Sequence, residues 1–196
     1  MSEAIEDLES QEVSGYILDL RSNPGGLLYS SIDIARMWLD EGDIVSTVNR
    51  QGVIDEEAAN NRALTDKPLV VIVDGGSASA SEILSGALQD NGRAVIVGTR
   101  TFGKGLVQSV RSLADGSGVA VTVAKYLTPD GRDINEHGID PDVAIEISEE
   151  QQELLAEERD RIGTEADPQF AEALEILNTE IRAAQEGNSL TSISEE

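Results

Sequence analysis

The segment LVVIVDGGSASASEI, residues 69–83, contains the change from a buried strand to a helix that decides the fold. Its first part, LVVIVD at 69–74, is an almost continuous run of β-branched and aliphatic residues, which is typical of a central strand buried on both faces. Its second part places Ser79 three residues before Glu82, the S-x-x-E signature of a capped helix start. The segment therefore predicts a strand, a turn of small residues and a helix.

Segments on both sides of this unit continue the alternation of strands and helices. GYILDL at 15–20 and AVIVG at 94–98 predict two further strands, and the apolar positions of residues 30–39 recur at helical spacing. Downstream, the turn ADGSG joins two strand-like runs, LVQSVRSL and GVAVTVAKYL, which predict an antiparallel pair. We therefore expect an α/β fold with a layered core and a mixed sheet.

Charge is distributed unevenly along the chain. The 38 acidic and 14 basic residues give a formal net charge of −24, to which residues 1–68 contribute −9, residues 69–143 contribute −3 and residues 144–196 contribute −12. The last part is also rich in Ala and Leu in a helical pattern. We predict a globular core over residues 1–147 and an acidic helical C-terminal extension over residues 148–196.

Composition excludes several classes of protein. The acid excess argues against nucleic-acid binding and against docking on anionic membranes, because both need clustered Lys and Arg. The chain has no cysteine, which excludes thiolate metal sites, and its single histidine, His137, is expected in a loop. No apolar run approaches the roughly 18 residues of a membrane-spanning helix. We therefore expect a soluble chain with no membrane insertion, no metal and no cofactor.

The stretch GGSASASEI at 75–83 has two compatible interpretations. As a capping motif, it only starts a helix. As a chemical site, it exposes a serine hydroxyl at a strand-to-helix turn, where free N–H groups can stabilise an oxyanion. These residues alone do not choose among Ser77, Ser79 and Ser81 as the nucleophile.

Two glycine-rich loops could complete such a site. GTRTFGKG at 98–105 matches a phosphate loop except that Gly105 replaces the Ser or Thr that holds magnesium, and a strand-like run follows where a phosphate loop would open a helix. Lys104 is alternatively a desolvated general base or an ordinary surface lysine on a bend. In LDLRSNPGG at 18–26, the two glycines present backbone N–H groups that suit an oxyanion, unless they only form a turn before a helix.

Taken in order, the motifs LDLRSNPGG, GGSASASEI and FGKGLVQ resemble those of the carboxyl-terminal processing proteases, also called tail-specific proteases. The residues of these motifs resemble most those of the photosynthetic and cyanobacterial branch of the family. The likeness continues to about residue 147. The resemblance implies a fold similar to the crotonase and Clp-protease cores, and a serine–lysine dyad. Carried across residue by residue, it implies Ser79 as the nucleophile, Lys104 as the general base and Gln108 as the residue that orients the lysine amine.

The same resemblance implies an oxyanion hole formed by the N–H groups of Ala80 and of Gly25 or its neighbour Gly26. It also implies an endopeptidase that acts by acyl transfer near the C-terminus of protein or peptide substrates with apolar tails. An extracytoplasmic compartment, periplasm or thylakoid lumen, is implied as well, and the family is compatible with a homo-oligomer. Gln108 suits its role because a neutral amide can hydrogen-bond an amine without favouring the ammonium form, as a carboxylate would.

Members of this family normally carry an export signal, a helical region and a PDZ domain before the LDLR segment, whereas this chain opens shortly before that segment. We therefore expect the catalytic portion of a longer protease, or a short form of one. Two other hypotheses stay open. The chain could be a truncated, inactive core that acts as a non-catalytic interaction module, or a nucleotide-binding protein, which rests on GTRTFGK alone.

Overall fold

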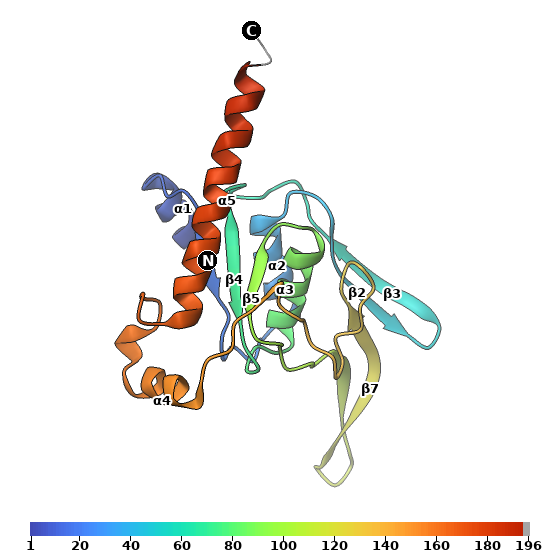
Figure 1. Ribbon diagram of the computed structural model, residues 1–196. Coiled ribbons are helices and arrows are strands. Elements are labelled where there is room, and N and C mark those ends of the chain that lie inside the picture. The colour runs from blue at the N-terminus through green and yellow to red at the C-terminus, as the bar shows by residue number, and fades with distance from the viewer. Residues whose placement is uncertain (194–196) are drawn as a thin grey trace.

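The computed structural model describes residues 1–193, which form two four-stranded sheets and the helices packed against them (Figure 1). The first sheet is parallel, with strand order β1-β4-β5-β8. Its strands are β1 (Tyr16–Asp19), β4 (Leu69–Val73), β5 (Val95–Gly98) and β8 (Val143–Ala144). All four strands of this sheet therefore end at one edge, where the loops that carry polar residues begin.

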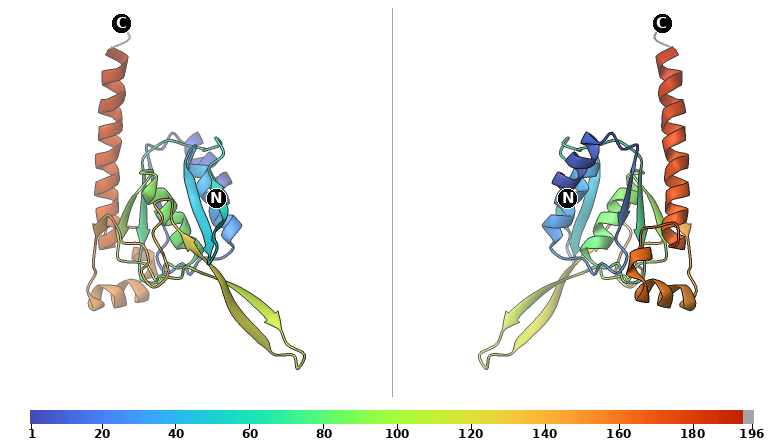
Figure 2. Two further views of the ribbon diagram at one scale, coloured as in Figure 1. Left: turned by 90° about the vertical axis from the view of Figure 1, so that its right-hand side faces the viewer. Right: turned by 90° about the vertical axis from the view of Figure 1, so that its left-hand side faces the viewer.

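The second sheet is antiparallel, with strand order β3-β2-β7-β6. Its strands are β2 (Asp43–Asn49), β3 (Gly52–Ala58), β6 (Leu106–Ser112) and β7 (Gly118–Leu127). β6 and β7 form a twisted ribbon that projects well beyond the body of the molecule, on the opposite side from the last helix (Figure 2). β6 is an edge strand of this sheet.

Five α-helices and one 3₁₀ turn complete the described residues. They are α1 (Ser2–Ser10), α2 (Leu28–Trp38), α3 (Ala80–Asp90), α4 (Glu149–Glu157), the turn η1 (Arg159–Arg161) and α5 (Pro168–Ile193). α2 and α3 contact each other, and α3 reaches both β5 and β2, so this helix pair lies between the two sheets. α5 contacts β1, β4 and β5 and covers the other face of the parallel sheet (Figure 1).

The alternation of side chains along β4 explains why its sequence is apolar throughout. All five residues of β4 are buried. Val71 and Val73 belong to the core on the side of α2 and α3, whereas Val70 and Ile72 pack with Ala173 of α5. Successive side chains of a strand point to opposite faces, so a strand covered on both faces must be apolar at every position.

The expected α/β class is confirmed, and the parallel and antiparallel strands segregate into two sheets rather than one. β8 was not predicted, because two residues are too short to give a periodic signal. The division at residues 147 and 148 stays a prediction, and α5 within the second segment forms part of the packing of the parallel sheet. Within residues 1–193, no helix is both long and apolar enough to cross a lipid bilayer.

Candidate active site

Ser79 lies at the turn that follows β4, immediately before α3. Its backbone has φ 56° and ψ −116°, a left-handed conformation that is strained for a residue with a side chain. The predicted capping box of Ser79 and Glu82 is found at the start of α3. In it, the Glu82 carboxylate accepts the backbone N–H of Ser79 at 2.8 Å. In α/β-hydrolases, a sharp, strained strand-to-helix turn presents the hydroxyl of a serine outward.

The three serines of the turn have different surroundings. Ser77 is fully buried, and its hydroxyl donates to the carbonyl oxygen of Leu20 at 2.7 Å and accepts the N–H of Asp74 at 3.0 Å. Ser81 is buried within α3. Ser79 alone among the three is half-buried rather than buried. A nucleophile must be reached by its substrate, so these surroundings favour Ser79.

Glu82 connects the serine turn to the glycine-rich loop at 98–105. Its carboxylate is fully buried. Oε1 accepts the Thr101 hydroxyl and the Gly103 N–H, both at 2.6 Å. Oε2 accepts the backbone N–H groups of Ser79 and Lys104, both at 2.8 Å. Four donors satisfy the buried charge, and the same hydrogen bonds hold the two loops in one position. The sequence identified Glu82 only as part of a capping motif.

The glycine-rich loop leads into a strand and not into a helix. β6 begins at Leu106, directly after Gly105. A Cβ atom added to Gly105 would lie 2.5 Å from the backbone nitrogen of Asn135, so the loop needs glycine there for close packing. A phosphate loop opens a helix whose N-terminus binds the anion. The geometry of this loop therefore gives no support to the nucleotide-binding hypothesis.

Lys104 and Gln108 lie on the same side of the molecule as the glycine-rich loop, and both side chains are exposed. Gln108 belongs to β6 and pairs with Thr122 of β7. Of the two alternatives that the sequence left open for Lys104, its exposure in this chain favours the surface lysine over the desolvated one. Exposed and half-buried side chains alternate at the start of β6, with Leu106 and Gln108 exposed and Val107 half-buried.

The loop that contains Gly25 lies against the start of α3. The backbone N–H of Ala78 donates to the carbonyl oxygen of Asn23 at 3.0 Å. Gly25 has φ +88°, and a Cβ atom added there would lie 2.6 Å from the backbone nitrogen of Ala80. The loop of Gly25 and the start of α3 therefore lie next to each other, and the oxyanion hole that the family resemblance implies for them stays a prediction. The N–H of Gly25 donates to Asn23 Oδ1 at 3.0 Å, while Gly26 is exposed.

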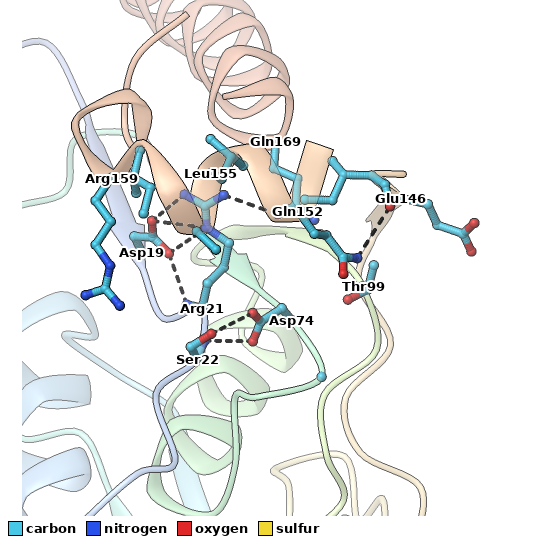
Figure 3. A pocket seen from close by; sticks show the side chains of 14 residues that line it. Asp19, Arg21, Ser22, Asp74, Thr99, Glu146, Gln152, Leu155, Arg159 and Gln169 are labelled. Carbon is cyan, nitrogen blue, oxygen red and sulfur yellow. Dashed lines mark hydrogen bonds and ion pairs between the residues drawn. The ribbon is translucent and has the colours of Figure 1, made fainter. Parts of the chain in front are cut away.

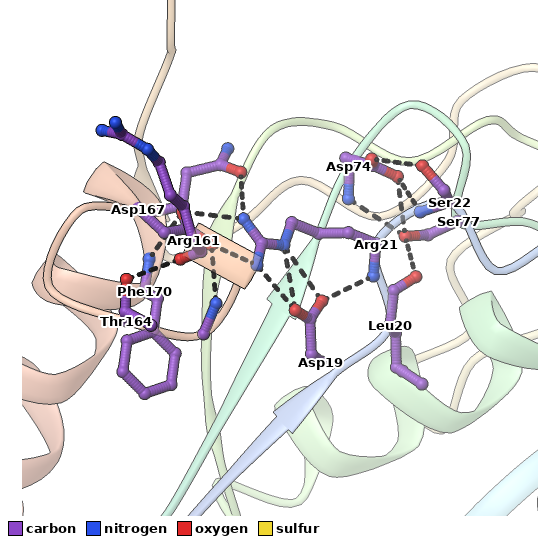
Figure 4. A network of polar contacts seen from close by, with 12 residues as sticks. Asp19, Leu20, Arg21, Ser22, Asp74, Ser77, Arg161, Thr164, Asp167 and Phe170 are labelled. Atoms are coloured by element: carbon purple, nitrogen blue, oxygen red, sulfur yellow. Dashed lines mark hydrogen bonds and ion pairs between the residues drawn. The ribbon is translucent and has the colours of Figure 1, made fainter. Parts of the chain in front are cut away.

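Arg21 ties this loop to the C-terminal segment (Figure 4). Its guanidinium binds Asp19 at 2.6 Å and the fully buried Asp167 at 2.7 Å, and it donates to Gln169 at 3.2 Å. Burial lowers the pKa of Arg21, but the hydrogen bonds to Asp19 and Asp167 outweigh it and raise the pKa above its usual value. Burial raises the pKa of Asp167, but the hydrogen bond from Arg21 outweighs it, so the net shift is downward.

Asp74 ends β4 and holds the neighbouring loop in place. Its carboxylate accepts the Ser22 N–H at 2.7 Å, the Ser22 hydroxyl at 3.2 Å and the Gly76 N–H at 2.9 Å. The loops that follow β1 and β4 are therefore joined by side-chain hydrogen bonds as well as by sheet pairing. Neither this contact nor that of Arg21 was predicted, because both join residues far apart in the sequence.

A cleft of about 1060 Å³ opens between the ends of the parallel strands and α4 (Figure 3). Asp19, Asp74 and Thr99 line it from the sheet side, and Leu155 and Arg159 line it from α4 and η1. Ligands of open α/β sheets commonly bind at this edge. Within the part of the chain that the structure describes, no group of three or more His, Asp or Glu side chains is placed to hold a metal ion.

The serine turn and the lysine loop thus lie beside each other on this α/β fold, joined by the buried Glu82. The chain belongs to peptidase family S41, whose model matches residues 1–145. A carboxyl-terminal-processing protease of Synechocystis sp. is 52% identical over 194 residues, which cover 99% of this chain and 44% of the relative. The chloroplastic carboxyl-terminal-processing peptidase 3 of Arabidopsis thaliana is 54% identical over 145 residues, which cover 73% of this chain and 28% of the relative.

A solved structure supports the same assignment. The photosystem II D1 C-terminal processing protease is 50% identical and superposes with a TM-score of 0.71, over 74% of this chain and 38% of that chain. The resemblance to the carboxyl-terminal processing proteases is thereby confirmed, and so is the similarity to their cyanobacterial and photosynthetic branch. The chain spans less than half the length of the curated relatives that it matches.

Proposed function

We propose that this chain is the catalytic core of a serine endopeptidase that cleaves polypeptides near their C-terminus. Ser79 is the nucleophile, Lys104 the general base, and Gln108 the residue that orients the lysine amine. The N–H groups of Ala80 and of Gly25 or Gly26 form the oxyanion hole. On this proposal residues 1–147 are the catalytic domain and residues 148–196 a C-terminal extension, of which α5 packs on the parallel sheet.

One observation carries the proposal: the bridge from Ser79 through Glu82 to Lys104. Both backbone N–H groups bind one carboxylate oxygen at 2.8 Å. Two loops from distant parts of the sequence are thus fixed beside each other, which is the requirement of a dyad. A fold without catalysis has no evident need to bury a charge in order to position a strained serine.

The reaction follows from these positions. The neutral amine of Lys104 takes the proton of the Ser79 hydroxyl as the oxygen attacks the scissile carbonyl carbon. The same proton then passes to the leaving amine, and the peptide bond breaks to give an acyl-enzyme. Water then attacks the ester carbonyl carbon, and Lys104 takes a proton from that water. Lys104 passes the proton to the Ser79 oxygen as the ester bond breaks, which releases the carboxyl group of the product and restores Ser79. Each step transfers one proton within the pair, so no metal or cofactor is required for balance.

The oxyanion hole rests on the contact between Gly25 and the start of α3. The first N–H groups of a helix have no partner within the helix and carry a partial positive charge. Ala80 is the first residue of α3, and the Gly25 backbone reaches within van der Waals distance of it. Donors fixed in this way stabilise the tetrahedral intermediate without reorganising during the reaction.

The relatives suggest the substrate class. The matched proteins are named as carboxyl-terminal-processing proteases, and one is named for the photosystem II D1 protein. We propose that this chain likewise acts on protein substrates with apolar C-terminal tails, in an extracytoplasmic or lumenal compartment. Assembly as a homo-oligomer belongs to the same proposal and is measured by light scattering on the purified protein.

The test is labelling by a fluorophosphonate probe followed by mass mapping of the modified residue. The proposal expects label on Ser79, strong loss of labelling in Lys104→Ala, and none in Ser79→Ala. Ser77→Ala and Ser81→Ala serve as matched controls, with the label retained wherever the protein stays folded. Absence of label from the folded wild-type chain would favour the non-catalytic interaction module instead.

A further inference from the structure

The edge of β6 starts beside the candidate dyad and is open along its length. β6 is the last strand in the order β3-β2-β7-β6, so within residues 1–193 only β7 pairs with it. It begins at Leu106, two residues after Lys104, and includes Gln108. An edge strand presents a row of unpaired N–H and C=O groups, which is a template for one more strand.

The hairpin register identifies which backbone groups face outward. The N–H of Leu113 donates to the carbonyl oxygen of Ser117 at 2.7 Å, which makes this pair a hydrogen-bonded one. In an antiparallel ladder, bonded and non-bonded pairs alternate along the strand. Counting back along β6, the residues that bond to β7 are the odd-numbered ones. The N–H and C=O groups that point away from β7 belong to Leu106, Gln108, Val110 and Ser112.

The same alternation holds at the start of β6, where the carbonyl oxygen of Gly105 accepts the N–H of Tyr126 at 2.8 Å. The register shift in this ribbon falls between Val107 and Gln108, where one extra residue is inserted in β7 and not in β6. The outward row on β6 is therefore uninterrupted. It offers matched donors and acceptors at every second residue from the lysine loop onward.

Side chains make this edge suitable for an apolar polypeptide. Leu106 and Val110 are exposed, Val110 at 74%. The opposite edge of the sheet, β3, carries three consecutive acids at 55–57, the charged type of edge that resists pairing. β6 carries no acid. Its only charge is Arg111, and with Lys104 the stretch 104–113 has two positive charges in a chain of net charge −24.

We propose that the substrate polypeptide docks on the open edge of β6 as an additional, extended strand, and so reaches Ser79 across the lysine loop. This rests on the proposed function. The occupant is an unfolded, apolar stretch of protein close to its free carboxylate, which the two positive charges of 104–113 favour. Docking covers Lys104 and Gln108, both exposed in the free chain, and removes water from the amine that must act as a base.

Two properties of the substrate follow. Main-chain hydrogen bonds are independent of side-chain identity, so cleavage depends on extended conformation more than on one sequence. Side chains that lie on the same face as Leu106 and Val110 alternate with those on the other face, so apolar residues are preferred at every second position. Proline at a position that donates to β6 is excluded, because it has no N–H.

Amide exchange measured by nuclear magnetic resonance on Ser79→Ala tests the docking directly, because this variant binds without cleaving. The probe is an octapeptide of alternating valine and alanine with a free carboxylate. The proposal expects new protection at Val110 and Ser112 on peptide addition, with no change at Ser109 and Arg111, which already bond to β7. Unchanged protection at Val110 and Ser112 would overturn it. So would protection that rises with protein concentration without peptide, which would mean strand pairing between two copies.

Cleavage by variants gives a second, independent test. Val110→Pro removes one outward N–H, and an edge position accepts proline when its N–H faces solvent. The rate of polypeptide cleavage is expected to fall about tenfold, because the loss of one hydrogen bond of ordinary strength weakens binding by about that factor. Val110→Ala keeps the N–H and is the matched control, and both folds are verified by circular dichroism. Equal cleavage by Val110→Pro and Val110→Ala overturns the docking. Failure of the wild type to label Ser79 overturns the proposed function instead.

Discussion

Ser79 and Lys104 donate their backbone N–H groups to the same atom, Oε2 of Glu82, each over 2.8 Å. One carboxylate therefore positions both the serine turn and the lysine loop, together with the direct hydrogen bond from the Phe102 N–H to the Ser77 carbonyl oxygen at 3.0 Å. Because that carboxylate is fully buried and has four donors, it has no freedom to move. In the proposed function, Glu82 is therefore a positioning residue: it holds the two loops and takes no part in proton transfer.

Glu82→Gln tests this dependence. The amide has one accepting oxygen and a donating nitrogen, so about half of the four donors lose their acceptor, at about 1–3 kcal/mol each. We expect the free energy of unfolding to fall by about 2–6 kcal/mol. We also expect labelling of Ser79 to slow by about 100-fold, because small displacements of reacting groups are costly. Glu180→Gln, at an exposed position of α5, is the control and is expected to change neither. Wild-type labelling by Glu82→Gln would contradict the positioning role.

Gly25 supports a second prediction about the oxyanion hole. Its φ of +88° disfavours a side chain, and a Cβ atom would approach the Ala80 nitrogen to 2.6 Å and the Ala78 oxygen to 2.5 Å. Gly25→Ala therefore displaces the donors, and we expect kcat to fall about 100-fold or more with a smaller change in KM. Gly131→Ala is the matched control: φ is +78° there, but a Cβ atom would meet nothing within 4 Å. Equal loss in both variants would assign the effect to backbone strain alone.

Local sequence patterns were sufficient for most of the fold. β4 and α3 were predicted because an apolar run, a turn of small residues and a capping signature follow each other within residues 69–83. The β6–β7 hairpin was predicted from two β-rich runs and the turn between them. In each case the signal lies within one element or between neighbours, where periodicity and turn chemistry act.

The remaining features depend on contacts between distant residues, which no local pattern reports. The separation into two sheets depends on β4 pairing with β1 and β5, and on β7 pairing with β2. Asp167 forms an ion pair with Arg21 although the two residues are 146 positions apart in the sequence. The dyad residues were identified from the family resemblance, and their roles stay predictions. The sequence left open whether Lys104 is desolvated or exposed, because the glycines around it do not indicate which elements cover a loop.

Gln108 gives a prediction about pH. A carboxylate near the amine would favour the ammonium form of Lys104, which cannot accept the serine proton. We therefore expect Gln108→Glu to shift the rising limb of the pH profile of kcat/KM toward higher pH. In this variant kcat/KM is expected to fall at neutral pH and to recover in part at alkaline pH. Gln108→Leu, which lacks the charge, is expected to lower kcat without moving the limb. A pH–rate profile of polypeptide cleavage measures both, and an unmoved limb in Gln108→Glu would exclude contact with the amine.

The link between Arg21 and Asp167 predicts that the C-terminal segment stabilises the core. Removal of one partner from a buried ion pair leaves the other charge uncompensated, which costs about 3 kcal/mol or more. We expect Asp167→Ala to lower the free energy of unfolding by about 3 kcal/mol in urea denaturation. Asp160→Ala, at an exposed position of η1, is the control and is expected to cost little. A small effect of Asp167→Ala would show that Asp19 alone satisfies Arg21.

Glu9 fixes α1 to the parallel sheet and predicts how stability depends on acid. Its carboxylate accepts hydrogen bonds from Lys67 Nζ and the Tyr16 hydroxyl, both at 2.6 Å. The hydrogen bond from Lys67, assisted by those from Thr65 and Tyr16, lowers the pKa of Glu9 from 4.5 to about 2. Because the folded pKa lies below the unfolded one, this contribution to stability is complete above pH 4.5 and is lost as the pH falls toward 2.

The difference in unfolding free energy between the wild type and Glu9→Gln isolates this contribution. We expect the difference to be constant above about pH 5, and to shrink steadily between pH 4.5 and 2, where the wild type alone must bind a proton on unfolding. Glu6→Gln changes an exposed carboxylate of the same helix and is expected to show no such slope. Urea unfolding followed by circular dichroism at several pH values measures all three proteins. A difference that stays constant down to pH 2 would mean that Glu9 ionises equally in the folded and unfolded chain, and that its contacts with Lys67 and Tyr16 do not stabilise the charge.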